Sequence, residues 1–181
     1  LFRSSLPESM AAPALVLHWS SNWLIAWVVG SLWTLSLAKA QATLDRPKSS
    51  VSVQHVYRCV LEDLMPLAEA KHIDIGVEGE QDAQLWVNEL DLIAVVKNLV
   101  DNAIRYTPEE GRVDLSVGVS EEKAELRVRD SGPGIPLAER DRVFDPFYRT
   151  LGSEQIGSGL GLSIVDRLAR ALNVGIALNS S

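Results

Sequence analysis

The chain has 181 residues, a length that fits one globular domain with a short extension. Its 46% hydrophobic and 23% charged residues exclude a disordered chain, and its net charge of −7 argues against general nucleic-acid binding, which needs a basic face. The single cysteine, Cys59, excludes a disulfide framework within the chain and a metal site built from several cysteines.

An apolar segment near the N-terminus is the first predicted element. Residues 10–38 contain no Asp, Glu, Lys or Arg. A membrane-spanning helix needs about 20 predominantly apolar residues. Lys39, Arg46 and Lys48 follow, which would place the C-terminal part inside the cell. Residues 1–40 are therefore interpreted either as a hydrophobic helix that spans the membrane or as a misjoined, out-of-frame stretch, and both interpretations stay open.

Several short elements follow. Residues 41–50 are interpreted as a linker or the remnant of a dimerisation helix, because RPKSS at 46–50 is typical of a connecting segment. The apolar patterns beyond it predict a strand, a helix and two further strands, at residues 51–53, 56–70, 73–77 and 85–87.

A helix predicted over residues 89–106 is the most informative stretch of the chain. Its apolar residues share one face, whereas Asn98, Asn102 and Arg105 lie on the opposite stripe. Asparagine is a poor helix former, so two of them four residues apart suggest that this polar stripe faces another group. Amide oxygens can ligate Mg²⁺, and a guanidinium can bind phosphate oxygens. The alternative at this stage is a solvated helix face.

Two alternating runs predict a pair of strands at residues 113–119 and 124–130, joined by a polar turn. Asp130 shares the inward face of the second run with Ala124, Leu126 and Val128. A buried carboxylate is costly unless it accepts hydrogen bonds. Asp130 therefore either receives a donor from a ligand or simply begins the turn that follows, and both can be true.

Glycine-rich loops follow these strands. Residues 131–161 carry three glycine clusters with little regular pattern, which is typical of lids and binding loops. The last cluster leads into an amphipathic helix predicted over 160–172, where free N–H groups at the helix start suit phosphate. A closing strand is predicted at 174–178.

In this order the motifs resemble the ATP-binding domain of bacterial sensor histidine kinases, in the GHKL ATPase superfamily. The resemblance rests on an N box, a first glycine box, an F box and a second glycine box, at residues 98–108, 130–136, 143–149 and 157–162. It implies an α+β fold: a two-layer α/β sandwich in which helices back a mixed sheet and a mobile lid covers ATP. The domain would cover residues 51–181 and lack the family's final strand, leaving an exposed sheet edge.

The resemblance also assigns roles. Asn98, Asn102 and Arg105 would be catalytic, with Asn102 as the Mg²⁺ ligand and Arg105 on phosphate. Asp130 would accept the adenine amino proton, and Tyr106 would pack beside the base. The full set expected to bind ATP is Asn98, Asn102, Arg105, Tyr106, Asp130, Gly132, Gly134, Ile135, Phe144, Phe147, Arg149, Gly157, Ser158, Gly159, Leu160 and Gly161.

The sequence departs from the family in one respect. None of its histidines, His18, His55 and His72, stands in a phosphoacceptor motif. The expected function is therefore to bind Mg-ATP and phosphorylate a histidine supplied elsewhere. The alternatives are a regulatory nucleotide-binding fragment without transfer activity and an ATP-hydrolysing relative, although the latter places a glutamate base where Asn98 stands.

The resemblance further implies partners and a location. The partners would be a histidine-bearing dimerisation domain and a response regulator, with a homodimer only if the helical hairpin is present. The location would be the cytoplasmic face of the bacterial inner membrane, or the cytoplasm if residues 1–40 do not span it.

Overall fold

The computed structural model describes residues 14–20, 24–25, 46–120, 123–148 and 159–178. In chain order, its strands and helices are β1 (Ala14–Ser20), β2 (Leu24–Ile25), β3 (Ser49–Ser52), α1 (Val53–Glu69), β4 (Asp74–Glu78), β5 (Gln84–Val87), α2 (Glu89–Tyr106), β6 (Arg112–Ser120), β7 (Lys123–Asp130), a short 3₁₀ turn η1 (Leu137–Glu139), α3 (Gly161–Leu172) and β8 (Gly175–Leu178).

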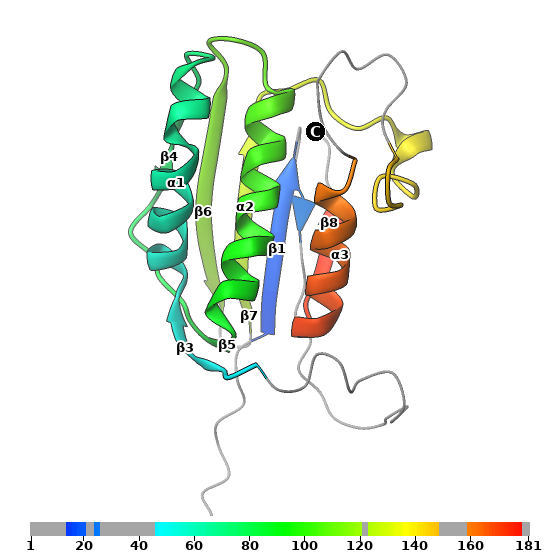
Figure 1. Ribbon diagram of the computed structural model, residues 1–181. Coiled ribbons are helices and arrows are strands. Elements are labelled where there is room, and N and C mark those ends of the chain that lie inside the picture. The colour runs from blue at the N-terminus through cyan, green and yellow to red at the C-terminus, as the bar shows by residue number, and fades with distance from the viewer. Residues whose placement is uncertain (1–13, 21–23, 26–45, 121–122, 149–158, 179–181) are drawn as a thin grey trace, which may run out of the picture.

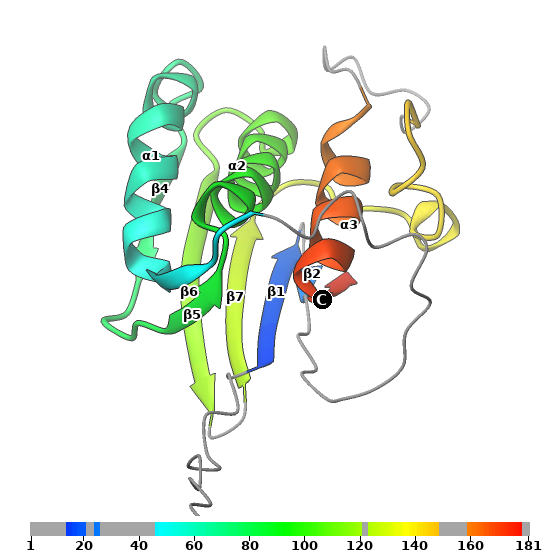
Figure 2. The same ribbon diagram turned by 60° about the horizontal axis from the view of Figure 1, so that its bottom comes forward.

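Two layers make up the fold. The helices α1, α2 and α3 lie side by side on one face of a mixed sheet, as Figures 1 and 2 show from two directions. The sheet has six strands in the order β2-β8-β1-β7-β6-β4, and β3 and β5 form a separate two-stranded ribbon. The expected α+β sandwich of helices on a mixed sheet is therefore confirmed.

Helix α2 lies at the centre of the helical layer and has the predicted bounds. Asn88 caps its start by accepting the backbone N–H of Asp91. The helix ends because Thr107 is extended and Pro108 follows it. Its apolar face is buried against α1 and the sheet, and this face consists of Leu92, Val95, Val96, Leu99, Val100, Ala103 and Ile104. The opposite stripe, which carries Asn98 and Asn102, therefore points away from this buried face.

The expected N-terminal hydrophobic helix is wrong for the part of it that the structure describes. Residues Ala14–Ser20 form β1, which runs parallel to β7 in a register from Ala14 opposite Lys123 to Ser20 opposite Arg129. An apolar run of this length fits a buried strand as well as a helix, and pairing on both sides satisfies its backbone within the sheet. Residues 26–40 lie outside the described ranges. Among the helices that the structure describes, none combines the length and apolar character needed to cross a bilayer.

The expected exposed edge beside the last strand is also wrong. Strand β8 pairs with both β1 and β2, so β1 occupies the position between β7 and β8. Sequence periodicity reports the face of a strand but not its neighbours, and for this reason the position of β1 was not predicted.

The segment before α1, from Arg46 onward, makes specific contacts with α2 and its N-cap, which a free linker would not make. Arg46 forms an ion pair with the buried carboxylate of Asp91, and Asn88 donates its side-chain N–H to the Pro47 carbonyl at 2.9 Å. Strand β3 starts at Ser49 and pairs antiparallel with β5. The end of the expected linker is therefore part of the folded domain.

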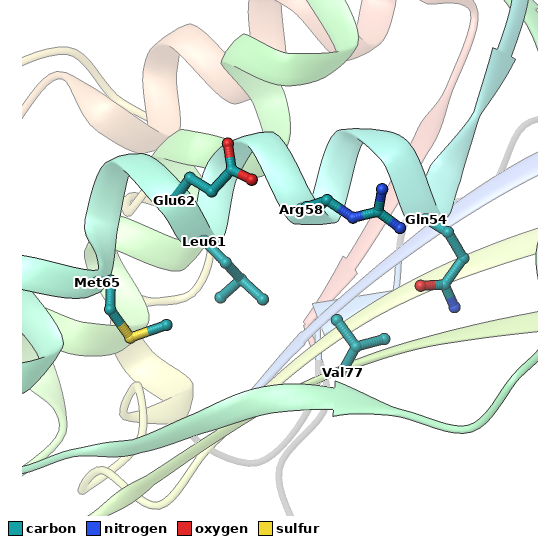
Figure 3. A pocket seen from close by; sticks show the side chains of 6 residues that line it. All are labelled: Gln54, Arg58, Leu61, Glu62, Met65 and Val77. Atoms are coloured by element: carbon teal, nitrogen blue, oxygen red, sulfur yellow. The ribbon is translucent and has the colours of Figure 1, made fainter.

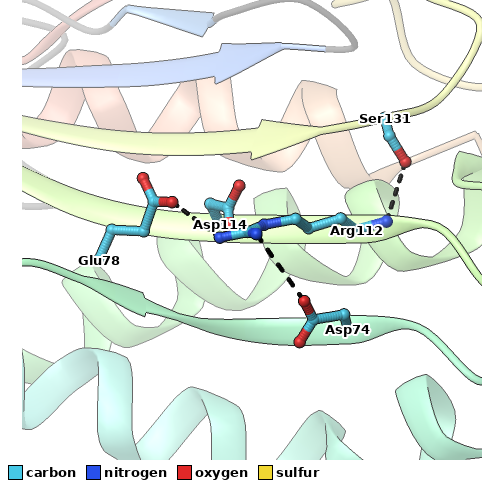
Figure 4. Close-up of polar contacts among 5 residues, drawn as sticks. All are labelled: Asp74, Glu78, Arg112, Asp114 and Ser131. Atoms are coloured by element: carbon cyan, nitrogen blue, oxygen red, sulfur yellow. Dashed lines mark hydrogen bonds and ion pairs between the residues drawn. The ribbon is translucent and has the colours of Figure 1, made fainter.

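Charged residues occupy the face of the sheet that the helices do not cover. Arg112 on β6 donates to Asp114 at 2.6 Å and to Glu78 on β4 at 2.8 Å, and Asp74 lies 4.0 Å away (Figure 4). These groups alternate with Val113 and Leu115, which are buried under the helices. The ion pairs are exposed to solvent, and we expect each to contribute little to stability.

Tyr57 is a buried anchor of α1 and gives a stability prediction. Its ring is fully buried, and its hydroxyl donates to the Ser116 carbonyl of β6 at 2.9 Å. Tyr57→Phe leaves that acceptor without its donor, so we expect the free energy of unfolding to fall by about 1 kcal/mol in urea titrations. Unchanged stability would contradict this.

The same residue gives a pH prediction. Burial raises the pKa of Tyr57 in the folded chain. The unfolded tyrosine ionises at about pH 10, so above that pH the unfolded chain releases a proton that the folded chain keeps. Stability should therefore fall as the pH rises beyond about 10, and this fall should be smaller in Tyr57→Phe.

Candidate functional site

The polar stripe of α2 meets the start of α3. A Cβ atom placed on Gly161 would lie 3.2 Å from the Asn102 side-chain nitrogen and 3.4 Å from the Asn98 side-chain oxygen. Asn98 donates its own N–H to the Ala94 carbonyl at 2.7 Å, which fixes the orientation of the amide. The tertiary fold thus brings together two predicted asparagines and a predicted glycine that are far apart in the sequence.

The start of α3 lies beside the polar stripe of α2. Leu160, at the N-cap position, has no side-chain oxygen with which to cap the helix. Its carbonyl accepts the backbone N–H of Ile164 at 3.0 Å and the Ser163 hydroxyl at 2.8 Å. The N–H groups of the first turn and the positive end of the helix dipole therefore lie beside the α2 asparagines, where they suit phosphate oxygens.

A second group of predicted residues lies at the C-terminal end of α2. Asp130 ends β7, is 6% exposed and accepts the Gly132 N–H at 2.8 Å. A Cβ atom on Gly132 would lie 2.8 Å from an Asp130 carboxylate oxygen and 2.9 Å from the Tyr106 carbonyl oxygen. Only glycine fits this cradle, which joins the turn after β7 to the end of α2.

One buried hydroxyl at this end was not predicted from the sequence. Thr107 is 1% exposed, and its hydroxyl oxygen is buried without a hydrogen-bond partner among the described residues. A buried polar atom of this kind normally has a partner, so leaving it unpaired costs stability.

Arg105 points to a neighbour on its own helix. Its Nε donates to Asp101 at 2.8 Å, and this hydrogen bond is the main reason why the pKa of Arg105 is raised. Asp101 is not among the residues predicted from the sequence, although the spacing of four residues is a signal for such a pair. Contact between Arg105 and a phosphate stays a prediction.

Four more of the predicted residues, Gly134, Ile135, Phe144 and Phe147, lie along the segment after β7, which is drawn in yellow beside α3 in Figure 1. Gly134 has a φ of +86°, and Ile135 and Phe144 pack partly buried against the core. Phe147 is 73% exposed, and its backbone N–H donates to the Gly159 carbonyl at 2.9 Å. Three predicted residues, Arg149, Gly157 and Ser158, lie outside the described ranges.

Gly159→Val tests the contact between these two segments. Gly159 has a φ of +68°, and a Cβ there would lie 2.9 Å from both the Phe147 carbonyl carbon and the Tyr148 carbonyl oxygen. A branched side chain is strained at this φ and would collide with backbone. We expect the affinity for ATP, measured by calorimetry, to fall about tenfold.

A matched glycine change controls for this prediction. Gly76→Ala lies on β4, where a Cβ would meet no atom within 4 Å, and it should leave the affinity unchanged. If Gly159→Val bound ATP as the wild type does, the Phe147–Gly159 contact would have no part in the site.

A separate hollow of about 400 Å³ lies between α1 and the edge strand β4 (Figure 3). It is lined by Gln54, Arg58, Leu61, Glu62, Met65 and Val77. None of these residues belongs to the predicted set, so the hollow is distinct from the site beside α2.

The side chains that could ligate a metal ion limit how such an ion would be bound. In the part of the chain that the structure describes, no group of three His, Cys, Asp or Glu side chains is arranged to hold a metal ion. The amide oxygen of Asn102 is a single hard donor, which fits Mg²⁺ only where a ligand's phosphates and water supply the other oxygens.

Comparisons with known proteins identify relatives. A family model described as histidine kinase-, DNA gyrase B-, and HSP90-like ATPase matches residues 87–181, more than half of the chain. The chain is 33% identical over 139 residues to the swarming motility regulation sensor protein RssA of Serratia marcescens, covering 75% of this chain and 29% of the relative. It is 44% identical over 110 residues to the sensor protein kinase PmrB of Pseudomonas aeruginosa, covering 60% and 23%.

A solved structure agrees with these relatives. Full-length ShkA in complex with AMPPNP matches with a TM-score of 0.63 and 30% identity, covering 74% of this chain and 28% of ShkA. The chain therefore spans less than a third of the length of each of these proteins.

Proposed function

The chain belongs to the histidine kinase-, DNA gyrase B- and HSP90-like ATPase family, and on that premise we propose that it binds Mg-ATP and transfers the γ-phosphoryl group to a histidine. Within the family it is of the sensor histidine kinase type, because its curated relatives are sensor kinases. The acceptor histidine is supplied by another part of a two-component sensor kinase.

The contact between Gly161 and the α2 asparagines carries the proposal. It brings amide oxygens, backbone N–H groups and the start of α3 to one place, which is a suitable environment for phosphates. A magnesium ion bound through Asn102 would neutralise phosphate charge. The AMPPNP bound by ShkA is an ATP analogue, which supports the same ligand class here.

The base would lie at the other end of α2. Asn98 and Tyr106 are eight residues apart, which is about 12 Å along a helix and comparable to the length of a nucleoside triphosphate. Asp130 would accept a hydrogen bond from the adenine amino group, and the Gly132 backbone would allow the ring to approach closely. Tyr106 would pack beside the ring.

No nucleophile is required from this domain. Asn98, Asn102 and the start of α3 would hold the triphosphate in place, so that the acceptor imidazole attacks the γ-phosphorus as the bond to the bridging oxygen breaks. Arg105 would exchange Asp101 for a phosphate oxygen when ATP binds. Catalysis would therefore consist of positioning and charge neutralisation.

Phosphotransfer to a separate hairpin tests the proposal. The full chain would be incubated with magnesium and γ-labelled ATP, with and without a purified histidine-bearing helical hairpin from a sensor kinase. We expect label on the hairpin histidine and none on this chain alone. ATP binding without transfer would point instead to a regulatory module, and steady ATP hydrolysis that Asn98→Ala abolishes would point to an ATPase.

The proposal extends to partners and location. The phosphorylated histidine would pass its phosphoryl group to a response regulator, and a homodimer would form through the hairpin domain. The domain would work at the cytoplasmic face of the bacterial inner membrane, as expected for a sensor kinase of this type.

A further inference from the structure

Lys71 links the helix α1 to the far end of α2. It lies in the turn between α1 and β4, and its ammonium group donates to three carbonyl oxygens: those of Ile104 and Arg105, both at 2.9 Å, and of Thr107, at 2.5 Å. These residues are more than 30 positions away in the sequence. All three donors of the ammonium are therefore used at one helix terminus.

The end of α2 needs such a partner. The last carbonyls of a helix have no partner within it, and many helices satisfy them with a glycine turn. Here Thr107 is extended and Pro108 has no N–H, so the backbone offers only the Thr107 N–H, which bonds the Ala103 carbonyl. Lys71 takes the role of the cap and places a positive charge at the negative end of the helix dipole.

The backbone of Lys71 is itself fixed on both sides. The Ile73 N–H bonds the Ala68 carbonyl at 2.9 Å, which closes the end of α1 around His72 at a φ of +53°. The Lys71 carbonyl accepts the Glu110 N–H at 3.1 Å. The side chain therefore extends from a rigid turn and is not a flexible surface lysine.

The helix end that Lys71 holds is the end at the Asp130 turn. The Tyr106 carbonyl, between two of the carbonyls that Lys71 contacts, lies against Gly132, and the buried Thr107 follows it. Asn98 and Asn102 lie one to two turns back inside the helix, where their positions depend on the body of α2. A shift of the helix end would thus move the base side of the site more than the phosphate side.

We propose that Lys71 is a positioning residue for recognition of the nucleotide base: its ammonium group fixes the C-terminal carbonyls of α2 and thereby holds Tyr106 and Thr107 against the Asp130–Gly132 turn. The inference rests on the proposed function, since it names a determinant of base recognition at the same site. Lys71 itself does not touch the nucleotide.

Lys71→Met tests the inference, because Met keeps the length of the side chain and removes the ammonium. Binding of Mg-ATP and Mg-GTP to the full chain would be measured by calorimetry, well below the melting temperature of each variant. GTP carries the same triphosphate with another base. We expect ATP affinity to fall about tenfold, GTP affinity to change less than about twofold, and Lys71→Arg to restore most of the ATP affinity through its own N–H donors.

Lys97→Met is the matched control. Lys97 lies on the exposed side of α2 and pairs with Asp63 at 2.7 Å, so its loss should leave both affinities unchanged. Lys71→Gln provides a second neutral variant in case Lys71→Met fails to fold.

The outcomes separate the two proposals. A wild-type chain that bound no ATP would refute the proposed function. If the wild-type chain bound ATP and the Lys71→Met variant bound it equally well, the inference alone would be overturned. An equal loss of ATP and GTP affinity, or unfolding of both neutral variants, would also overturn it, because Lys71 would then stabilise the domain without acting on base recognition.

Discussion

Asn102→Ala is expected to abolish magnesium-dependent ATP binding, with a loss of affinity of about 100-fold or more. The amide lies beside Gly161 at the start of α3, where the proposed site holds the metal and the phosphates. Alanine offers no oxygen ligand, and water alone cannot replace the fixed geometry that the helix provides. Calorimetric titrations with and without magnesium measure the effect.

The fold should tolerate this change. Asn102 is half-buried, and its side chain makes no hydrogen bond within the ranges that the structure describes. Alanine is the better helix former, so thermal stability should be unchanged or slightly higher. Asn98→Ala serves as a graded comparison and should cost less, because the proposed site has Asn102 as the metal ligand. Undiminished magnesium-dependent binding by Asn102→Ala would place the nucleotide elsewhere.

Asp130→Asn is the second prediction with a large effect. The carboxylate is buried at the end of β7, and the amide that replaces it would present a donor N–H to the donor amino group of adenine. Leaving such groups unpaired in a buried site discriminates strongly against a ligand. We expect ATP affinity to fall about 30- to 100-fold, equivalent to about 2–3 kcal/mol, while GTP affinity changes far less.

Asp114→Asn controls for loss of a carboxylate on the same sheet. Asp114 lies on β6, pairs with Arg112 and faces away from the helices (Figure 4). It should leave nucleotide binding unchanged. The asparagine at position 130 can still accept the Gly132 N–H through its oxygen, so the turn should persist. If Asp130→Asn kept its preference for ATP over GTP, the adenine would not lie at this carboxylate.

The predicted elements differ in how far they agree with the structure. The bounds of α2 are those predicted, and β6, β7 and α3 begin or end within one or two residues of the expected positions. These elements have a long pattern of one period, bounded by Asn, Pro or Gly. The apolar run that contains β1 has no such pattern, since a buried strand and a buried helix both present continuous apolar residues.

The same distinction applies to the candidate site. The spacing within α2 places Asn98 and Asn102 on one stripe, and the alternation in β7 places Asp130 on the inner face, so both features follow from local geometry. The contact partners of Lys71 and Arg46 do not follow from local geometry. Lys71 meets the end of α2, and Arg46 meets Asp91, over separations of more than 30 residues that no periodicity reports.

By itself the sequence determined which residues share a face, where the main helices and strands break, and which chemical groups are available for a nucleotide. Only the tertiary structure decided which faces meet: Gly161 against the asparagines, Gly132 against Tyr106, and β1 between β7 and β8. The reason is physical. Backbone geometry repeats along a chain and is encoded locally, whereas the contact between two elements depends on the packing of all the side chains that separate them.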